Sequence, residues 1–253
     1  MQSLAEQIAA WMRDQIDAAD ARGLIVGLSG GINSTVVAGL CRLAAPGASA
    51  AVLLPCQSDS QDESDARLAA DQFQLPALTV NLDAVYDVLG HTLRAASAEW
   101  PGGVAPPDET SSRALLSTTK PRLRMMVLSF LAARLGYLVA GTADKGELSL
   151  GRYAKYGDGL GDLLPLGDLL KSQVRALAQA LDVPAAIVGK PPSPGIWPRS
   201  QDGADTDLTD ADLEKYLAGG PETVAPALAL RIERLVRASG RRWSHIPICE
   251  IKP

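Results

Sequence analysis

Three short polar stretches of the sequence have the residue types that a phosphate-handling site needs. The first, SGGINST, combines Gly30 and Gly31 with the hydroxyl groups of Ser29, Ser34 and Thr35. Glycines allow a tight turn and a close approach to a ligand, and a following helix points its positive N-terminus at the turn. The resulting N–H donors suit an anion the size of pyrophosphate. The stretch matches neither the Walker pattern nor G-x-G-x-x-G, and the alternative is a turn that binds nothing.

Two further polar stretches, PCQSDSQD (55–62) and GTADKGE (141–147), also follow apolar runs. In open α/β sheets, ligands bind beyond the carboxyl ends of the strands. If the apolar runs are parallel strands of one sheet, all three polar stretches lie at the same edge of that sheet. Their convergence predicts a ligand site there.

The elements that must position these stretches follow from hydrophobic patterning. Four short, nearly wholly apolar runs are typical of buried strands: 24–28, 48–55, 77–82 and 137–142. Apolar periodicity and polar-faced composition predict helices over 4–16, 35–44, 60–73, 83–96, 123–136, 170–181, 209–219 and 224–240. Ser34 is a candidate cap for the second helix. This alternation predicts the α/β class: a doubly wound, Rossmann-like parallel sheet in a single domain over residues 1–253.

Two connections interrupt the alternation of strands and helices. The stretch EWPGGVAPPDETSS is rich in turn-forming residues, and glycine and proline dominate residues 144–209. We therefore expect mobile loops near residues 99–112 and 190–208.

Composition narrows the class of protein. With 253 residues, 47% hydrophobic and 21% charged, the chain has ordinary globular values. A net charge of −5 argues against a general nucleic-acid binder. The three cysteines show no metal or disulfide spacing, and the acidic, amphipathic N-terminus is unlike a signal peptide. No apolar run reaches the roughly 18 residues of a membrane span, so we expect a cytoplasmic protein without nucleic-acid or membrane partners.

The polar stretches also resemble a known family. LSGGINST resembles the pyrophosphate-binding SGG-x-D-S loop of the N-type ATP pyrophosphatases, the PP-loop superfamily. Four later stretches resemble motifs of ammonia-dependent NAD synthetase in order and spacing: KPRLRM, GTADKGE, KYGDGLGDLLPLGDLLKSQVRALA and KPPSPGIW. The resemblance covers nearly the whole chain. It implies an adenine nucleotide alpha hydrolase-like fold and a homodimer.

The resemblance implies a two-step ligase reaction that uses ATP and Mg²⁺. The enzyme would adenylate the nicotinate carboxylate of deamido-NAD and release pyrophosphate, after which ammonia displaces AMP to give NAD. Adenylation is needed because a carboxylate is a poor acyl donor. No glutaminase domain is recognised in the chain, so we expect free ammonia, or ammonia from a separate glutaminase, as the nitrogen source.

For individual residues, the resemblance implies four groups. The ATP-binding residues are Ser29, Gly30, Gly31, Asn33, Ser34, Arg122, Thr142, Lys171 and Ser193. The metal ligands are Glu147 and, more weakly, Asn33. The acceptor-binding residues are Lys155, Asp158, Asp162, Lys190, Arg241 and Arg242. The catalytic residues are Asp158, Lys171 and Ser193.

The resemblance also implies specific roles within these groups. Asp158 would orient ammonia, Lys171 and Lys190 would lie near the phosphates, and Ser193 would lie on a lid that excludes water. Each has a plainer alternative: Glu147 as a solvated loop residue, GDGLGD as a simple turn, and the lysines as solvated charges.

The sequence departs from the family pattern at both ends of the expected site. Asn33 replaces the family's metal-holding aspartate; an amide oxygen still ligates a hard cation but brings no charge. It is a tolerated change, a sign of retuned chemistry or an engineered substitution. Ser117 and Thr118 replace Gly-Asn, SGRRW replaces SEHKR, and the lid segment reads QDGADTD. Two alternatives therefore remain: a paralogue that amidates a different carboxylic acid, and a catalytically silent nucleotide-binding protein.

Overall fold

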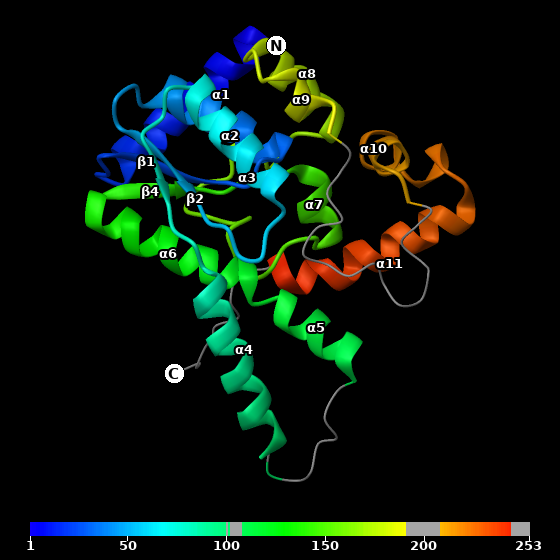
Figure 1. Ribbon diagram of the computed structural model, residues 1–253. Coiled ribbons are helices and arrows are strands. Elements are labelled where there is room, and N and C mark those ends of the chain that lie inside the picture. Colours follow the sequence, from blue (N-terminus) through cyan, green and yellow to red (C-terminus); the bar gives the residue numbers. More distant parts are fainter. Residues whose placement is uncertain (100, 102–107, 191–207, 244–253) are drawn as a thin grey trace, which may run out of the picture.

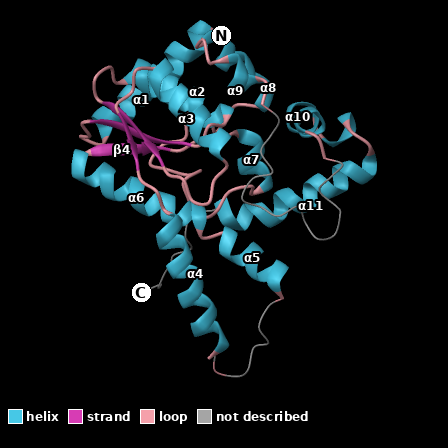
Figure 2. Cartoon of the chain, in the orientation of Figure 1, coloured by secondary structure: helices cyan, strands magenta, loops and turns pink. Residues whose placement is uncertain are grey.

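The chain forms a parallel β-sheet between two layers of helices (Figures 1 and 2). The structure, a computed structural model, describes residues 1–99, 101, 108–190 and 208–243. The strands are β1 (Gly23–Leu28), β2 (Ser49–Leu53), β3 (Ala77–Thr79) and β4 (Tyr137–Ala140). All pairings are parallel, in the order β3-β2-β1-β4. The predicted α/β class with a doubly wound parallel sheet is confirmed.

The strand order creates a point where the direction of winding reverses. The chain runs outward from β1 to β2 and β3, then returns to the other side of β1 as β4. Leu24 of β1 therefore lies between Ser49 of β2 and Leu138 of β4. In open α/β sheets, ligands bind beyond the carboxyl ends of the strands at which the winding reverses, here β1 and β4.

The strands are buried on both faces because helices cover each side. Leu24, Val26 and Leu28 of β1 join the first core, whereas Ile25 and Val139 join the second. The helices over the first core are α1 (Gln2–Ala18), α2 (Ile32–Ala44), α3 (Ser60–Gln72), α8 (Lys171–Ala180) and α9 (Ala185–Val188). The helices over the second are α4 (Asp83–Ala98) and α6 (Lys120–Leu135). This two-sided burial explains the nearly continuous apolar strand sequences.

A smaller core lies to one side of the sheet. Leu150, Leu213 and Ile232 are buried together where three helices meet. These helices are α7 (Lys145–Leu150), α10 (Asp210–Gly219) and α11 (Pro226–Trp243), with a 3-10 turn at Pro221–Thr223. In Figure 1, α10 and α11 extend away from the sheet, while α7 lies between them and the strands.

The structure differs from the sequence predictions in three short helices and one helix cap. Helix α5 (Glu109–Ser117) begins inside the expected 99–112 loop, and α7 and α9 lie in regions predicted without helices. Ser34 is not a cap, because α2 already begins at Ile32 with Gly31 at its N-cap. The expected loop at 190–208 falls almost wholly outside the described residues. Among the helices described, none is long and apolar enough to span a membrane.

Candidate active site

The loop after β1 turns sharply against the start of α3. Gly30 has a φ of 77°, and a Cβ atom there would lie 2.3 Å from the Asp62 carbonyl oxygen. Only glycine fits this position, because both the backbone angle and the close approach exclude a side chain. The hydroxyl oxygens of Ser29 and Ser34 lie 3.0 Å apart, and Ser34 also accepts from the Ser29 N–H. These hydroxyls therefore hold the loop itself in shape.

This loop presents backbone donors beyond the carboxyl end of β1. The first N–H groups of an α-helix have no acceptor within the helix, and α2 begins immediately after the loop at Ile32. The helix dipole adds partial positive charge at the same end. The arrangement suits a phosphate or pyrophosphate group.

The loop after β4 ends in a capped helix. The Glu147 N–H donates to Asp144 Oδ1 at 2.9 Å, and the Asp144 N–H donates to Glu147 Oε2 at 3.1 Å. This is a capping box, with aspartate at the N-cap of α7 and glutamate three residues later. The cap gives both carboxylates a defined orientation beyond the carboxyl end of β4.

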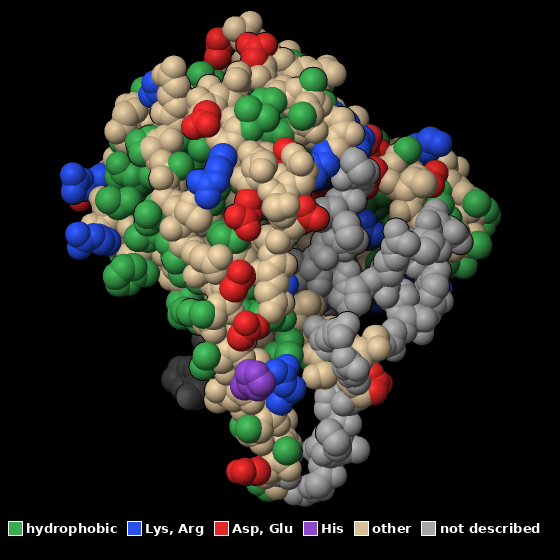
Figure 3. Space-filling model, viewed as in Figure 1, with side chains coloured by type: hydrophobic (Ala, Val, Ile, Leu, Met, Phe, Trp, Pro, Cys, Tyr) green, Lys and Arg blue, Asp and Glu red, His purple; other side chains and the backbone are tan. Residues whose placement is uncertain are grey.

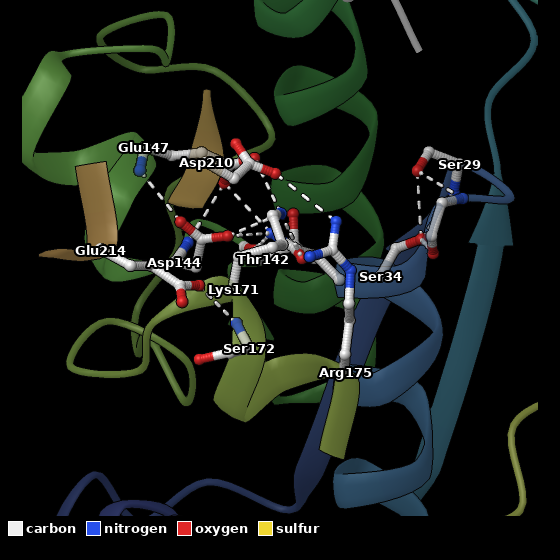
Figure 4. A network of polar contacts seen from close by, with 12 residues as sticks. Ser29, Ser34, Thr142, Asp144, Glu147, Lys171, Ser172, Arg175, Asp210 and Glu214 are labelled. Atoms are coloured by element: carbon white, nitrogen blue, oxygen red, sulfur yellow. Dashed lines mark hydrogen bonds and ion pairs between the residues drawn. The ribbon is translucent and has the colours of Figure 1, made fainter. Parts of the chain in front are cut away.

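Asn33 joins the two loops. Figure 4 shows its partners Thr142, Asp144, Glu147 and Lys171 within one polar network. Its Nδ2 lies within hydrogen-bonding distance of Thr142 O at 3.1 Å, Asp144 Oδ2 at 3.1 Å and Glu147 Oε2 at 3.2 Å. Its Oδ1 accepts from Lys171 Nζ at 3.0 Å. An amide Nδ2 carries two hydrogens, so the three acceptors share them.

Lys171 completes this cluster from the first turn of α8. Its Nζ lies 2.7 Å from Asp144 Oδ2 and 3.9 Å from Glu147 Oε1. The side chain of Asp144 is only 2% exposed, so its charge needs a partner. Burial raises the pKa of Glu147 to about 7; nearby Asp144 adds to this effect and Lys171 opposes it. The cluster therefore holds one firmly paired carboxylate and one whose charge is easily changed.

A second charged group lies on the turn that packs under the β4 loop. The N–H groups of Thr142 and Ala143 donate to Gly159 O, which ties this turn to the first cluster. Burial raises the pKa of neighbouring Asp158 to about 6, and Arg124, 3.8 Å away, opposes the rise. An acid with this pKa is ionised at neutral pH and readily takes up a proton.

Arg124 connects this turn to the end of β2. Its Nε donates to Leu54 O at 3.0 Å, and its Nη2 lies 3.4 Å from Ser58 Oγ. Because Arg124 also faces Asp158, it links the polar stretch 55–62 to the turn that carries Asp158. This arginine is not among the site residues expected from the sequence.

The polar stretch 55–62 and the first turns of α3 bind Lys190. Lys190 Nζ donates to Asp62 Oδ1 and to Asp65 Oδ2, both at 2.6 Å. These aspartates lie on α3 beneath Gly30, whose position depends on the Asp62 carbonyl. All three predicted stretches thus meet at the carboxyl edge of the sheet.

Comparison with known proteins identifies the family to which this arrangement belongs. Residues 4–230 match the family model described as NAD synthase. The chain belongs to the NAD synthase family. Its members are ATP-using ligases, so the resemblance seen in the sequence is confirmed.

Relatives within the NAD synthase family match most of the chain. A protein of Carboxydothermus hydrogenoformans named NH(3)-dependent NAD(+) synthetase is 41% identical over 215 residues, 85% of this chain and 84% of the relative. One of the same name from Syntrophomonas wolfei is 35% identical over 252 residues, covering 100% and 97%. The solved NMN synthetase of Francisella tularensis is similar in structure, with a TM-score of 0.84, 27% identity and 98% coverage of both chains.

Other residues that the NAD synthase resemblance singled out are placed as follows. Arg122 lies at the edge of the site, where it donates to Lys155 O at 3.2 Å and to Thr118 O at 2.6 Å. The exposed Asp162 instead accepts from the Val139 N–H at 2.7 Å and so extends the edge of the sheet. Ser193, and the side chains of Arg241 and Arg242 in the last turn of α11, lie outside the described residues.

Three residues of this NAD synthase site were missed in the sequence: Asp144, Asp62 and Asp65. Asp144 had a detectable signal, because D-x-x-E at 144–147 is a helix-capping pattern. Asp62 begins a D-x-x-D spacing with Asp65 at the start of a predicted helix, which puts both on one face. Nothing local indicates that their partner would be Lys190.

The donor set of the first cluster fits a hard divalent cation. The carboxylates of Asp144 and Glu147 lie together, and Mg²⁺ prefers such oxygen ligands while keeping several waters. Asn33 turns its amide nitrogen to these carboxylates and its oxygen to Lys171. Within the described ranges, no group of three or more His, Cys, Asp or Glu suited to a metal is found.

Proposed function

We propose that this chain is an ammonia-dependent NAD synthetase. It adenylates the carboxylate of deamido-NAD with ATP, releases pyrophosphate, and transfers ammonia to give NAD and AMP. The observation that carries the proposal is the cluster of Asn33, Asp144, Glu147 and Lys171, which joins the phosphate-type loop to the loop after β4. Family membership supplies the reaction class.

The ATP end of the proposed site is the loop after β1. The acceptor carboxylate attacks the α-phosphorus, and the bond from this phosphorus to the oxygen shared with the β-phosphate breaks. Negative charge then accumulates on the leaving pyrophosphate. The N-terminus of α2 and Lys171 lie where they can stabilise this charge, and such fixed donors need no reorganisation during the reaction. Ser29, Gly31 and Ser34 shape the loop.

Mg²⁺ belongs to this proposal, with Glu147 as its protein ligand and Asn33 and Asp144 beside it. When bound, the ion neutralises charge on the phosphate oxygens. The chain's own contribution is to keep the Glu147 carboxylate oriented through the cap of α7. Burial raises the pKa of Glu147 to about 7, and an arriving cation would lower it and favour the ionised carboxylate.

The ammonia end of the proposed site is the turn that carries Asp158. In the second step, the ammonia nitrogen attacks the acyl carbon, the C–O bond to AMP breaks, and one proton leaves the nitrogen. An ionised Asp158 can hold ammonia by a hydrogen bond and accept this proton. Lys155 supplies positive charge for the acceptor phosphates, and its carbonyl accepts from Arg122 on the ATP side. The Lys190 ammonium group is instead paired with Asp62 and Asp65.

A second acceptor has a specific observation in its favour. The Francisella NMN synthetase has a TM-score of 0.84 with this chain, and an enzyme of that name forms the amide on a mononucleotide. The chemistry at the carboxylate is the same. Nicotinate mononucleotide is therefore the second candidate acceptor.

We also propose a homodimer, because α4, α5 and α6 carry large exposed apolar side chains. Val88 is 67% exposed, Leu115 62%, Met126 60% and Phe130 69%. Figure 3 shows hydrophobic side chains among polar ones along this side of the molecule. Burial of such side chains against a second copy would remove them from water.

A cytoplasmic enzyme supplied with free ammonia, or with ammonia from a separate glutaminase, completes the proposal. The buried Cys41 and Cys56 are free thiols, which agrees with a reducing compartment.

The test is a parallel incubation with ATP, Mg²⁺, ammonium and either deamido-NAD or nicotinate mononucleotide, with NAD, NMN and AMP measured by mass spectrometry. We expect NAD and AMP in equal amounts with deamido-NAD and much less product with the mononucleotide. NMN as the main product would establish the second acceptor. Neither product, despite ATP binding, would overturn the proposed function and favour the silent nucleotide-binding protein.

A further inference from the structure

The amide at position 33 lies between two carboxylates and an ammonium group. Asn33 Nδ2 is 3.1 Å from Asp144 Oδ2 and 3.2 Å from Glu147 Oε2, while Asn33 Oδ1 is 3.0 Å from Lys171 Nζ. Each end of the amide thus meets a partner of matching polarity. An aspartate at position 33 would put an oxygen in place of Nδ2, facing two other carboxylates across hydrogen-bonding distance.

Asp144 carries the negative charge closest to Lys171. The Lys171 Nζ to Asp144 Oδ2 distance is 2.7 Å, against 3.9 Å to Glu147 Oε1. Asp144 is almost wholly buried, so this pair is shielded from water and salt. Lys171 comes from α8, and Asp144 fixes where its ammonium group lies relative to the loop after β1.

We propose that Asp144 is a positioning residue that supplies, from the loop after β4, the carboxylate that the SGG-x-D-S pattern places at position 33. Asn33 and Asp144 form a matched pair in which one member must be neutral and the other charged. The pair aims Lys171 at the phosphate loop. This inference deepens the proposed function, on which it rests for the role of Lys171. It means that the charge of Asp144 replaces the negative charge that Asn33 lacks.

A plainer role for Asp144 is to cap α7 and nothing more. Asparagine caps helices about as well as aspartate, so Asp144→Asn keeps the cap and removes only the charge. If capping were the whole role, this variant would match the original protein. The charge-swapped double variant, Asn33→Asp with Asp144→Asn, would instead recreate the pair in reverse, with the carboxylate at position 33 facing Lys171 and the amide at position 144.

The experiment compares four proteins: the original chain, Asn33→Asp, Asp144→Asn and the double variant. Three quantities are measured: the unfolding midpoint without nucleotide or metal, the dissociation constant for ATP with Mg²⁺ by calorimetry, and the kcat and KM of AMP formation. Asp108→Asn is the matched control, because Asp108 caps α5 through the Ser111 N–H.

We expect strong non-additivity in all three quantities. Each single variant should unfold several degrees lower than the original protein, and its ATP dissociation constant should differ about tenfold. Its kcat should fall about tenfold. In the double variant, the dissociation constant and kcat should return to within about threefold of the original values. If Asp144 only capped α7, the double variant would not recover these values. Asp108→Asn should change nothing beyond a small shift in midpoint.

Two results would overturn the inference. Asp144→Asn equal to the original protein would show that Asp144 only caps α7. Single effects that simply add in the double variant would show that positions 33 and 144 act independently. If no acceptor gives product, the proposed function fails, yet the unfolding midpoints and ATP binding still decide whether the pair exists.

Discussion

Lys190 Nζ lies 2.6 Å from both Asp62 Oδ1 and Asp65 Oδ2. The Asp65 side chain is only 6% exposed, so removal of the lysine would leave a buried carboxylate without its counter-charge. This contact joins Lys190 to α3. The Asp62 carbonyl of α3 in turn lies against the turn at Gly30. It therefore couples two segments that both border the proposed ATP site.

We predict that Lys190→Gln destabilises the fold by about 1–3 kcal/mol at neutral pH, since a buried ionised group loses its partner. Lys145→Gln breaks a 2.9 Å pair whose aspartate is 94% exposed, and it should cost less than about 1 kcal/mol. Urea unfolding of both variants measures the difference. Equal costs would show that the Lys190 contact is as weak as a surface pair.

The same variant has a defined pH dependence. The hydrogen bond from Lys190 lowers the pKa of Asp65, so the stabilisation is fully present above the unfolded carboxyl pKa of about 3.9. It is lost as the pH falls through the lower folded pKa. The stability gap between the original protein and Lys190→Gln should therefore narrow below about pH 4.

Gly30→Ala should damage the phosphate loop more than its backbone angle alone explains. Gly47 has a similar φ of 81° but open space around the added Cβ, whereas the Cβ at Gly30 would meet Asp62 O at 2.3 Å. Gly47→Ala should cost about 1–2 kcal/mol and leave ATP binding intact. Gly30→Ala should cost more and weaken ATP binding at least about tenfold, measured by calorimetry. Similar ATP affinities in the two variants would count against a phosphate role for this loop.

Glu147→Gln should abolish Mg²⁺-dependent pyrophosphate release and leave the fold intact. The amide keeps the shape of the side chain but removes the charge that a hard cation prefers. Circular dichroism checks the fold, and Asp168→Asn, at a 94% exposed carboxylate, is the control. If the Glu147→Gln variant releases pyrophosphate at a near-normal rate, Glu147 is not a ligand of Mg²⁺.

The reaction should lose rate below about pH 6, where Asp158 becomes protonated and can no longer accept a proton. Arg124 lowers the pKa of Asp158, so Arg124→Gln should move this acid limb to higher pH. Asp158→Asn should remove the limb and reduce kcat about a hundredfold at pH 8. Rates are compared at constant free ammonia, because ammonium itself titrates. If Arg124→Gln does not move the acid limb of the pH–rate profile, the limb belongs to a group other than Asp158.

Phe130→Glu should convert the proposed dimer to a monomer, because a carboxylate replaces a 69% exposed aromatic ring on α6. Leu43→Glu is the control, since Leu43 is 43% exposed on α2, across the sheet from α6. Light scattering after gel filtration measures the mass. If the Phe130→Glu variant is still a dimer, the interface lies elsewhere. If the original protein is a monomer, the proposed homodimer is wrong.

The amino-acid sequence by itself determined the layout of the sheet and the edge that carries the site. Unbroken apolar runs such as LIVGL predict buried strands. A glycine turn directly before a helix predicts an anion-binding loop, and both patterns can be read from neighbouring residues. Short helices in polar or glycine-rich connections, such as α5 and α7, lack a long apolar periodicity. They form because tertiary packing completes them: Leu150 of α7, for example, is buried against Leu213 and Ile232.

Only the tertiary structure decided which charges meet. Asn33 contacts Asp144 across 111 residues, and Lys190 reaches Asp62 across 128. Such pairs depend on the strand order β3-β2-β1-β4, which brings the ends of β1 and β4 together. The departure at Asn33 was visible in the sequence, but its partner was not. A side chain's electrostatic environment is set by neighbours in space, and local sequence patterns carry no information about them.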